Sequence, residues 1–162
     1  MEKNICKNFI EKGRDINYIG KLNDHDSYLK MLKVLERNCK YIALDCSHEI
    51  INEFQNDIIG YEISNTVWGT WTSIKFKVTF IKASKKLFEY LKKYETFCKY
   101  LRNVKKEAWG IKFMCDDVEI TSFGWSNIAF YDEDFSVLLC TNTHEGFIDV
   151  RDDIDKKYRN YK

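Results

Sequence analysis

The sequence predicts a single α+β domain in which a mostly antiparallel sheet of about five to seven strands has helices packed on one face. The chain has 162 residues, a common length for one domain, and 44% of them are hydrophobic, which is enough for a sizeable core. Helical patterns dominate the first part of the chain, and short strand-like segments joined by turn residues follow. This order is typical of an antiparallel sheet with segregated helices. No linker or repeat divides residues 1–162.

Apolar residues at helical spacing predict four helices. They cover residues 26–39, 47–58, 83–104 and 152–162. Asp26 or Ser27 can cap the first helix, and Ser47 and Ser84 can cap the second and third. The third segment has the longest apolar stripe and is the strongest helix in the chain.

Alternating or apolar segments predict the strands. They cover residues 40–46, 60–67, 73–81, 109–115, 118–123, 127–131, 135–140 and 146–150. In 73–81, Val78 and Phe80 alternate with Lys75 and Lys77, which indicates a half-buried strand. Residues 68–71, with Gly69 at their centre, have the composition of a hairpin turn.

The composition excludes several classes of protein. The first residues lack the apolar run of a signal peptide, and no segment reaches the roughly eighteen apolar residues of a membrane span. We therefore expect a cytoplasmic protein whose six cysteines are reduced. No metal is expected, because CxxC and HxxxH pairs are absent, and no cofactor is expected, because GxGxxG and GxxxxGK motifs are absent.

The stretch CTNTHEGFIDV, residues 140–150, contains the first candidate for catalysis. A general base needs an imidazole oriented by a carboxylate, as His144 and Glu145 could provide. Neighbouring residues on a strand point to opposite faces, however, so the pair works only if Gly146 breaks the strand. A polar turn that ends the strand is the favoured interpretation.

The stretch DCSHE, residues 45–49, contains the second candidate. Cys46 precedes a predicted helix, where the helix dipole lowers the pKa of a thiol, and His48 or His144 could serve as its base. The alternative is an inert thiol buried at a strand end. The alternative functional hypothesis is a small hydrolase or nuclease that uses His144 and Glu145, with Cys46 or Asp45 as a further catalytic residue.

Basic residues are concentrated on the third predicted helix. Residues 82–106 contain nine Lys or Arg and two Glu, a net charge of +7. A solvated helix face is the simpler interpretation. The alternative is a nucleic-acid-binding face on helix 84–104, with tyrosines for stacking. Its predicted contact residues are Lys85, Lys92, Lys93, Lys99 and Arg102.

Acidic residues are concentrated in the strand-rich half. Residues 116–155 contain eleven Asp or Glu and one Arg, a net charge of −10. Most lie in predicted turns, which form one negative surface if the turns meet at one end of the sheet, and we predict that this surface binds a basic protein. The predicted contact residues are Asp116, Asp117, Trp125, Tyr131, Asp132, Glu133, Asp134 and Asp149. The aromatic rings, with Phe130, would supply apolar anchors.

Residues 127–150, NIAFYDEDFSVLLCTNTHEGFIDV, and VWGTW at 67–71 resemble segments of small bacterial α+β proteins, some of them similar to immunity proteins of polymorphic toxin systems. The resemblance implies a cytosolic binding protein that blocks a toxin, and it transfers no functional residue. Phage-encoded inhibitors of host defence share this pattern. The predicted function is therefore that of a non-enzymatic inhibitor or immunity-type protein, and the predicted partner is a basic toxin or a nucleic-acid-processing enzyme.

Overall fold

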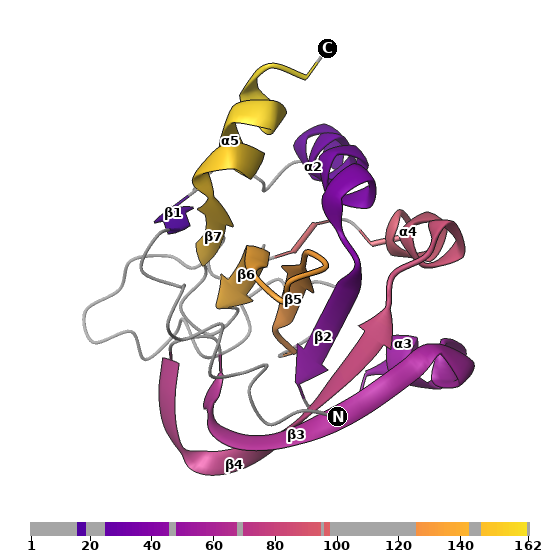
Figure 1. Cartoon of the computed structure of the whole chain (residues 1–162), viewed down its shortest axis with the longest axis vertical. Helices are drawn as coiled ribbons and strands as arrows, with labels where there is room; N and C mark the ends of the chain where they lie inside the picture. Colours follow the sequence, from indigo (N-terminus) through magenta and orange to yellow (C-terminus); the bar gives the residue numbers. More distant parts are fainter. Residues whose placement is uncertain are drawn as a thin grey trace, which may run out of the picture.

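The computed structural model of the chain describes residues 16–18, 25–45, 48–67, 70–94, 96–97, 126–142 and 147–161. These residues form one seven-stranded sheet with the helices packed on one of its faces (Figure 1). Every strand pair in the sheet is antiparallel. The predicted α+β fold is therefore confirmed.

The strand order is β1-β7-β6-β5-β2-β4-β3. The strands are β1 (Ile16–Tyr18), β2 (Tyr41–Asp45), β3 (Ile58–Val67), β4 (Thr70–Lys82), β5 (Ile128–Tyr131), β6 (Val137–Asn142) and β7 (Phe147–Arg151). Six of them match or overlap predicted strands, whereas the predicted strands at 109–115 and 118–123 lie outside the described residues. The hairpin β3–β4 and the meander β5–β6–β7 meet at β2, which pairs with both β4 and β5.

The helices are α2 (His25–Asn38), α3 (Glu49–Glu53), α4 (Lys85–Leu91) and α5 (Asp152–Arg159), with a short 3₁₀ turn η2 (Gln55–Asp57) after α3. Two predicted caps are wrong. Asp26 and Ser27 lie inside the first turn of α2, and His48 rather than Ser47 caps α3. The predicted Ser84 cap is confirmed, because its hydroxyl accepts from the Leu87 N–H at 3.1 Å.

The predicted helix 83–104 is wrong beyond Leu91. The chain turns there, and the Tyr94 N–H donates to the Leu91 carbonyl at 3.2 Å in a turn instead of continuing the helix. Tyr94 and Phe97 are both fully buried in this non-helical segment. Burial of two large rings outweighs the helix propensity of the surrounding lysines and glutamates, which is worth only a few tenths of a kcal/mol per residue. Residues 98–104 lie outside the described residues.

Alternate strand residues supply two apolar clusters, one on each face of the sheet. Ile42 and Leu44 pack with the helices, whereas Ala43 between them belongs to the cluster on the other face. Phe130 and Tyr131 divide in the same way. Both faces of the central strands are therefore covered.

A register shift in the β5–β6 ladder alters this alternation once. Phe130 pairs with Leu139, but the next residue of β5, Tyr131, pairs with Val137, so Leu138 is the extra residue of a β-bulge. As a result, Leu138 and Leu139 both contribute to the cluster beneath the helices. The bulge adds one more leucine to the main core.

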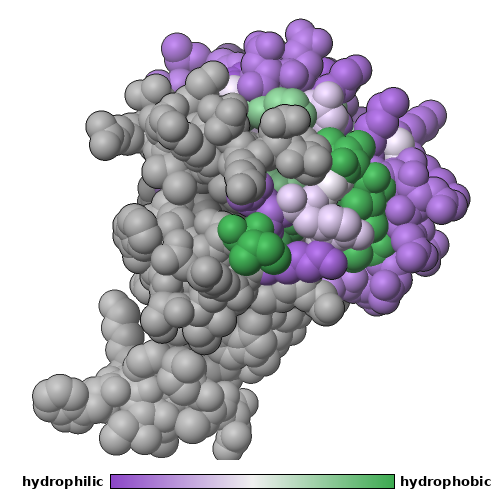
Figure 2. All heavy atoms as spheres, turned by 60° about the horizontal axis from the view of Figure 1, so that its bottom comes forward, coloured by the Kyte–Doolittle hydropathy of each residue, from purple (hydrophilic) through white to green (hydrophobic). Residues whose placement is uncertain are grey.

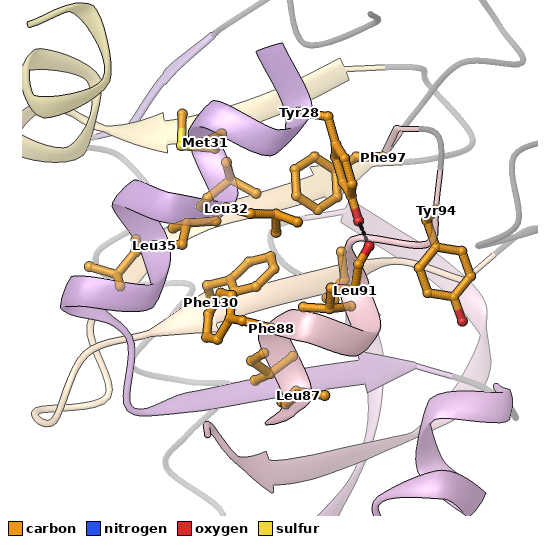
Figure 3. Close-up of a cluster of buried hydrophobic side chains, with 14 of the residues drawn as sticks. Tyr28, Met31, Leu32, Leu35, Leu87, Phe88, Leu91, Tyr94, Phe97 and Phe130 are labelled. Atoms are coloured by element: carbon orange, nitrogen blue, oxygen red, sulfur yellow. Dashed lines mark hydrogen bonds between the residues drawn. The ribbon is translucent and has the colours of Figure 1, made fainter. Parts of the chain in front are cut away.

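Helix α2 is joined to α4 through a buried hydrogen bond. The Tyr28 hydroxyl donates to the Leu91 carbonyl at 2.5 Å, at the C-terminal end of α4 (Figure 3). The Tyr28 ring also meets Phe97 edge-on, with centroids 4.7 Å apart, and Phe97 in turn meets Phe130 of the sheet. Burial raises the pKa of Tyr28, so its hydroxyl remains a donor. None of the helices described has the length and apolar character needed to cross a membrane.

Candidate functional site

Many of the residues predicted to form a site lie outside the described part of the chain. They are Cys46, Lys99, Arg102, Asp116, Asp117, Trp125, His144 and Glu145. The proposed pairings of His144 with Glu145 and of Cys46 with a histidine therefore stay predictions. The remaining candidates are described, and they fall into separate groups: the residues of the β5–β6 turn, Asp149 on β7, and the residues of α4 and the start of α3.

The β5–β6 turn is organised by the carboxylate of Asp132. Its Oδ1 accepts from the backbone N–H groups of Asp134 and Ser136, each at 2.9 Å. Its Oδ2 accepts from Arg151 Nη1 at 2.8 Å. Asp132 is thus a structural residue of the turn, whereas the adjacent Glu133 and Asp134 are exposed.

Arg151 extends this network to the start of α5. Its Nε and Nη2 donate to the two carboxylate oxygens of Asp153 at 2.6 and 2.9 Å, which is a bidentate pair. The hydrogen bonds from Arg151 lower the pKa of Asp153, and the carboxylates of Asp153 and Asp132 raise that of Arg151. The charge of Asp132 is therefore already compensated within the protein.

The turn also contains a residue in an unfavourable backbone conformation. Phe135 has a φ of 56°, in the left-handed region that favours glycine. Its ring stacks on Tyr41 of β2, with centroids 4.3 Å apart and planes 11° apart. This stack stabilises the strained residue and fixes the direction in which Glu133 and Asp134 project.

The prediction that Tyr131 and Phe130 anchor a partner is wrong, because both side chains are fully buried. They lie on β5, which has β2 on one side and β6 on the other, so their rings enter the clusters on the two faces of the sheet. A strand in the middle of a doubly covered sheet leaves no face for a partner.

Asp149 lies on β7, between the buried residues Ile148 and Val150 of the main core. It therefore points to the opposite face, where it pairs across the ladder with Cys140. Burial raises its pKa, and no described side chain compensates its charge. Asp149 is half-buried and apart from the exposed acids of the β5–β6 turn.

The residues predicted to form one basic helix face lie partly beyond the end of that helix. Lys85 is exposed on α4, whereas Lys92 lies after the helix and pairs with Glu89 at 2.6 Å. Lys93 pairs with Glu49 at 3.0 Å, and Tyr94, one of the expected stacking rings, is buried. Two of these lysines, Lys92 and Lys93, are therefore engaged in local ion pairs, and nucleic-acid binding by this segment stays a prediction.

A polar cluster forms where the chain leaves α4 and meets the start of α3. The Tyr94 hydroxyl donates to Glu49 Oε1 at 2.5 Å, and Lys93 Nζ lies 4.0 Å from the centroid of the Tyr90 ring. His48 Nδ1 accepts from the Ile50 N–H at 3.2 Å, which caps α3 and requires this nitrogen to be unprotonated.

The electrostatics of this cluster favour fixed charges. The hydrogen bond from Tyr94 and that from Lys93 lower the pKa of Glu49. Burial, followed by the bond to Glu49, raises the pKa of Tyr94, and the bonds to Tyr90 and Glu49 raise the pKa of Lys93. Each shift moves the pKa of the group further from neutral pH, so each group keeps one protonation state, which suits a structural contact better than proton transfer.

The edge of the sheet at β3 carries a surface that the sequence analysis missed. Among the described residues, the exposed large hydrophobic side chains are Tyr61 and Ile63, which are 47% and 60% exposed. They alternate along β3, so they point to the same side. The alternating pattern of GYEISNTV predicts an apolar strand face, but the pattern does not tell whether that face is buried or exposed to solvent.

A pocket of about 340 Å³ adjoins these side chains. It lies between α3 with η2 and the strands β3 and β4, and it is lined by Ile51, Asn52, Gln55, Ile58, Tyr61, Lys77 and Thr79. Lys77 Nζ lies 3.9 Å from the centroid of the Tyr61 ring. Figure 2, turned toward the side of β3 and β4, shows hydrophobic atoms in green beside hydrophilic atoms in purple. We call Tyr61, Ile63 and the residues lining this pocket the β3 surface.

In the part of the chain that the structure describes, no three His, Cys, Asp or Glu side chains gather as metal ligands would. Comparison with known proteins found no match to a family model, a curated protein or a solved structure. The resemblance of residues 127–150 to immunity-type proteins stays a prediction.

Proposed function

We propose that this protein is a cytosolic, non-enzymatic binding protein of the inhibitor or immunity type, and that it holds a basic protein partner through the β3 surface. The observation that carries the proposal is the exposure of Tyr61 and Ile63 on β3. Apolar side chains rimmed by polar ones are typical of interaction sites, and tyrosine is enriched among the residues that dominate binding energy.

The position of β3 supports this role. It ends the strand order, and no described strand pairs with its outer side. It is ten residues long, so it offers an extended platform next to the pocket. A partner side chain can enter the pocket, where the Asn52 and Gln55 amides provide both donors and acceptors.

The charges around this platform favour a basic partner. Glu53 and Asp57 are exposed on the elements that form the surface, and Lys77 is the basic residue among those lining the pocket. Carboxylates at the rim of an interface increase the rate of encounter with a basic protein. The negative charge of this surface agrees with the acidic binding surface predicted from the sequence, although that prediction placed the surface on residues 116–149.

The experiment is capture of partners from the source cell with the wild-type protein and with a Tyr61→Ala, Ile63→Ser double variant. We expect one stoichiometric protein that the wild type retains and the double variant loses. The control is a Lys33→Ala, Lys86→Ala variant, which changes exposed residues on α2 and α4 and should retain the partner. Equal retention by all three proteins, or no retained protein, would contradict the proposal.

A further inference from the structure

A second groove lies where the C-terminal halves of α2 and α5 come together. These helices stand beside each other at one end of the molecule (Figure 1). The groove has a volume of about 580 Å³, which is within the range of pockets that hold small molecules. The polar and aromatic side chains that line it are Arg37, Asn38, Lys156, Lys157, Asn160 and Tyr161. None of the described lining residues is acidic.

The positive charge of the groove is only partly used by the protein. Lys157 Nζ donates to Asn38 Oδ1 at 2.7 Å, which joins the two helices. Arg37 and Lys156 are exposed, and among the described residues neither has a carboxylate within ion-pair distance. Their charges are therefore available to an anion.

The acidic residues nearest in sequence are mostly engaged by other cations. Asp153 is held by Arg151, although Lys157 also contributes to its lowered pKa, and Asp155 is held by Arg159 at 3.0 Å. Glu36 precedes Arg37 in the sequence. Together with the larger effect of Glu89, it raises the pKa of Lys92, so its carboxylate interacts with the residue that follows α4. The groove side of α2 and α5 is left with an excess of positive charge.

Aromatic rings alternate with cations along the contact between the two helices. Lys30 Nζ lies 4.4 Å from the centroid of the Tyr158 ring, and the Arg37 guanidinium lies 5.4 Å from that of Tyr161. A guanidinium and a ring at the wall of a basic groove are surfaces on which a nucleobase can stack. The amides of Asn38 and Asn160 can hydrogen-bond to base edges or sugars.

We infer that the α2–α5 groove binds nucleotides through their phosphate and base, most readily within single-stranded nucleic acid. Arg37 and Lys156 would contact phosphate, and Tyr161 would stack on a base. This inference is independent of the protein partner proposed for the β3 surface.

Helix C-termini attract basic residues because of the helix dipole, which is an alternative reason for Arg37, Lys156 and Lys157. The dipole does not explain a ring beside the cations, nor a groove without a carboxylate. It predicts a contribution of these residues to stability, whereas nucleotide binding predicts a contribution to affinity. The two explanations can therefore be separated by experiment.

The experiment is fluorescence anisotropy of the full chain with a short labelled single-stranded oligonucleotide at several salt concentrations. Two phosphate contacts predict a slope of roughly −1.4 for log affinity against log salt, since each releases about 0.7 counterion from a single strand. Arg37→Gln with Lys156→Gln should weaken binding about tenfold or more and bring the slope closer to zero. Tyr161→Ala should weaken binding about fivefold or more, and Tyr161→Phe should not.

The matched control is Lys82→Gln with Lys86→Gln, which removes two exposed charges at the end of β4 and on α4. It should leave affinity within about twofold of wild type, while melting curves verify that every variant is folded. Competition by adenosine monophosphate would assign the site to free nucleotides, and competition by the oligonucleotide alone would assign it to the strand. Absence of binding at low salt, equal weakening by the control pair, or equal affinity for polyglutamate would overturn the inference.

Discussion

Arg151 Nη1 donates to Asp132 Oδ2 over 2.8 Å, and this ion pair joins the β5–β6 turn to the end of β7. Both side chains are largely buried, with 25% of Arg151 and 21% of Asp132 exposed. Because Oδ1 of Asp132 also accepts two backbone N–H groups, both carboxylate oxygens have partners. The acid at the centre of the predicted binding surface is thus part of the framework of the protein.

Replacing Asp132 should destabilise the protein. Asp132→Ala leaves Nη1 of Arg151 and two backbone N–H groups without their acceptor, at a cost of about 1–3 kcal/mol in the free energy of unfolding. Urea unfolding measures this change. Glu133→Ala in the same turn is the control and should change stability by less than about 0.5 kcal/mol. Equal effects of the two substitutions would show that Asp132 does not organise the turn.

The difference between Asp132 and its neighbours shows what the sequence could reveal about the site. DED between two apolar segments predicts a hairpin turn with acidic residues, and the structure contains that turn. Which carboxylate points inward depends on Arg151, which is 19 residues away in the sequence and adjacent only after β6 and β7 have paired. Pairing across strands is not encoded in local composition.

The hydroxyl of Tyr28 should contribute to stability through α4. Tyr28→Phe removes the donor to the Leu91 carbonyl, which is one of the last acceptors of this short helix. We expect a loss of about 0.5–1.5 kcal/mol in the free energy of unfolding, because the buried carbonyl loses one of its two donors and keeps only the Tyr94 N–H. Tyr61→Phe, at an exposed tyrosine, is the control for loss of a hydroxyl. A similar stability of both variants would contradict this prediction.

The end of α4 illustrates why the helices were predicted better in position than in length. The stripe of Leu87, Leu91 and Tyr94 has helical spacing, and all three side chains are buried as expected. The stripe could not reveal that Tyr94 and Phe97 reach the core from a turn. Phe97 contacts Phe130 of β5, a strand that is distant in the sequence. Such tertiary contacts override local helix propensity and decide where the helix ends.

Asp149 should reduce stability as the pH rises. Burial raises its pKa in the folded protein above the unfolded value of about 3.9, so folding favours the protonated carboxyl. Its contribution to stability is full below that unfolded value and is lost as the pH rises through the folded pKa. Asp149→Asn should therefore be more stable than wild type at neutral pH, and the difference should shrink in acid.

Chemical unfolding from acidic to neutral pH measures that difference. Asp153→Asn provides a control of opposite sign, because Arg151 lowers the pKa of Asp153. The stability contributed by Asp153 is present above the unfolded pKa and is lost as the pH falls through the folded one. Wild type should thus be more stable than Asp153→Asn at neutral pH and should lose that advantage in acid. A pH-independent effect of Asp149→Asn would refute the assignment of a raised pKa.

Glu133 and Asp134 provide a test of the acidic turn that does not disturb the fold. Both are exposed and no described ion pair involves their carboxylates, so Glu133→Gln with Asp134→Asn should leave the melting temperature unchanged. If the turn attracts the basic partner, the association rate should fall about threefold or more at low salt and converge with wild type at high salt. Stopped-flow or surface-based kinetics with the captured partner measure both rates.

The same kinetic measurements distinguish long-range electrostatic attraction, which affects the association rate, from direct packing against the partner, which affects the dissociation rate. Tyr61→Ala on the β3 surface should mainly raise the dissociation rate, since short-range packing affects dissociation more than encounter. Glu36→Lys makes the same change in net charge as the turn variant, but on the exposed side of α2. If Glu36→Lys slows association as much as the turn variant does, net charge governs the encounter and the β5–β6 turn has no specific part in it.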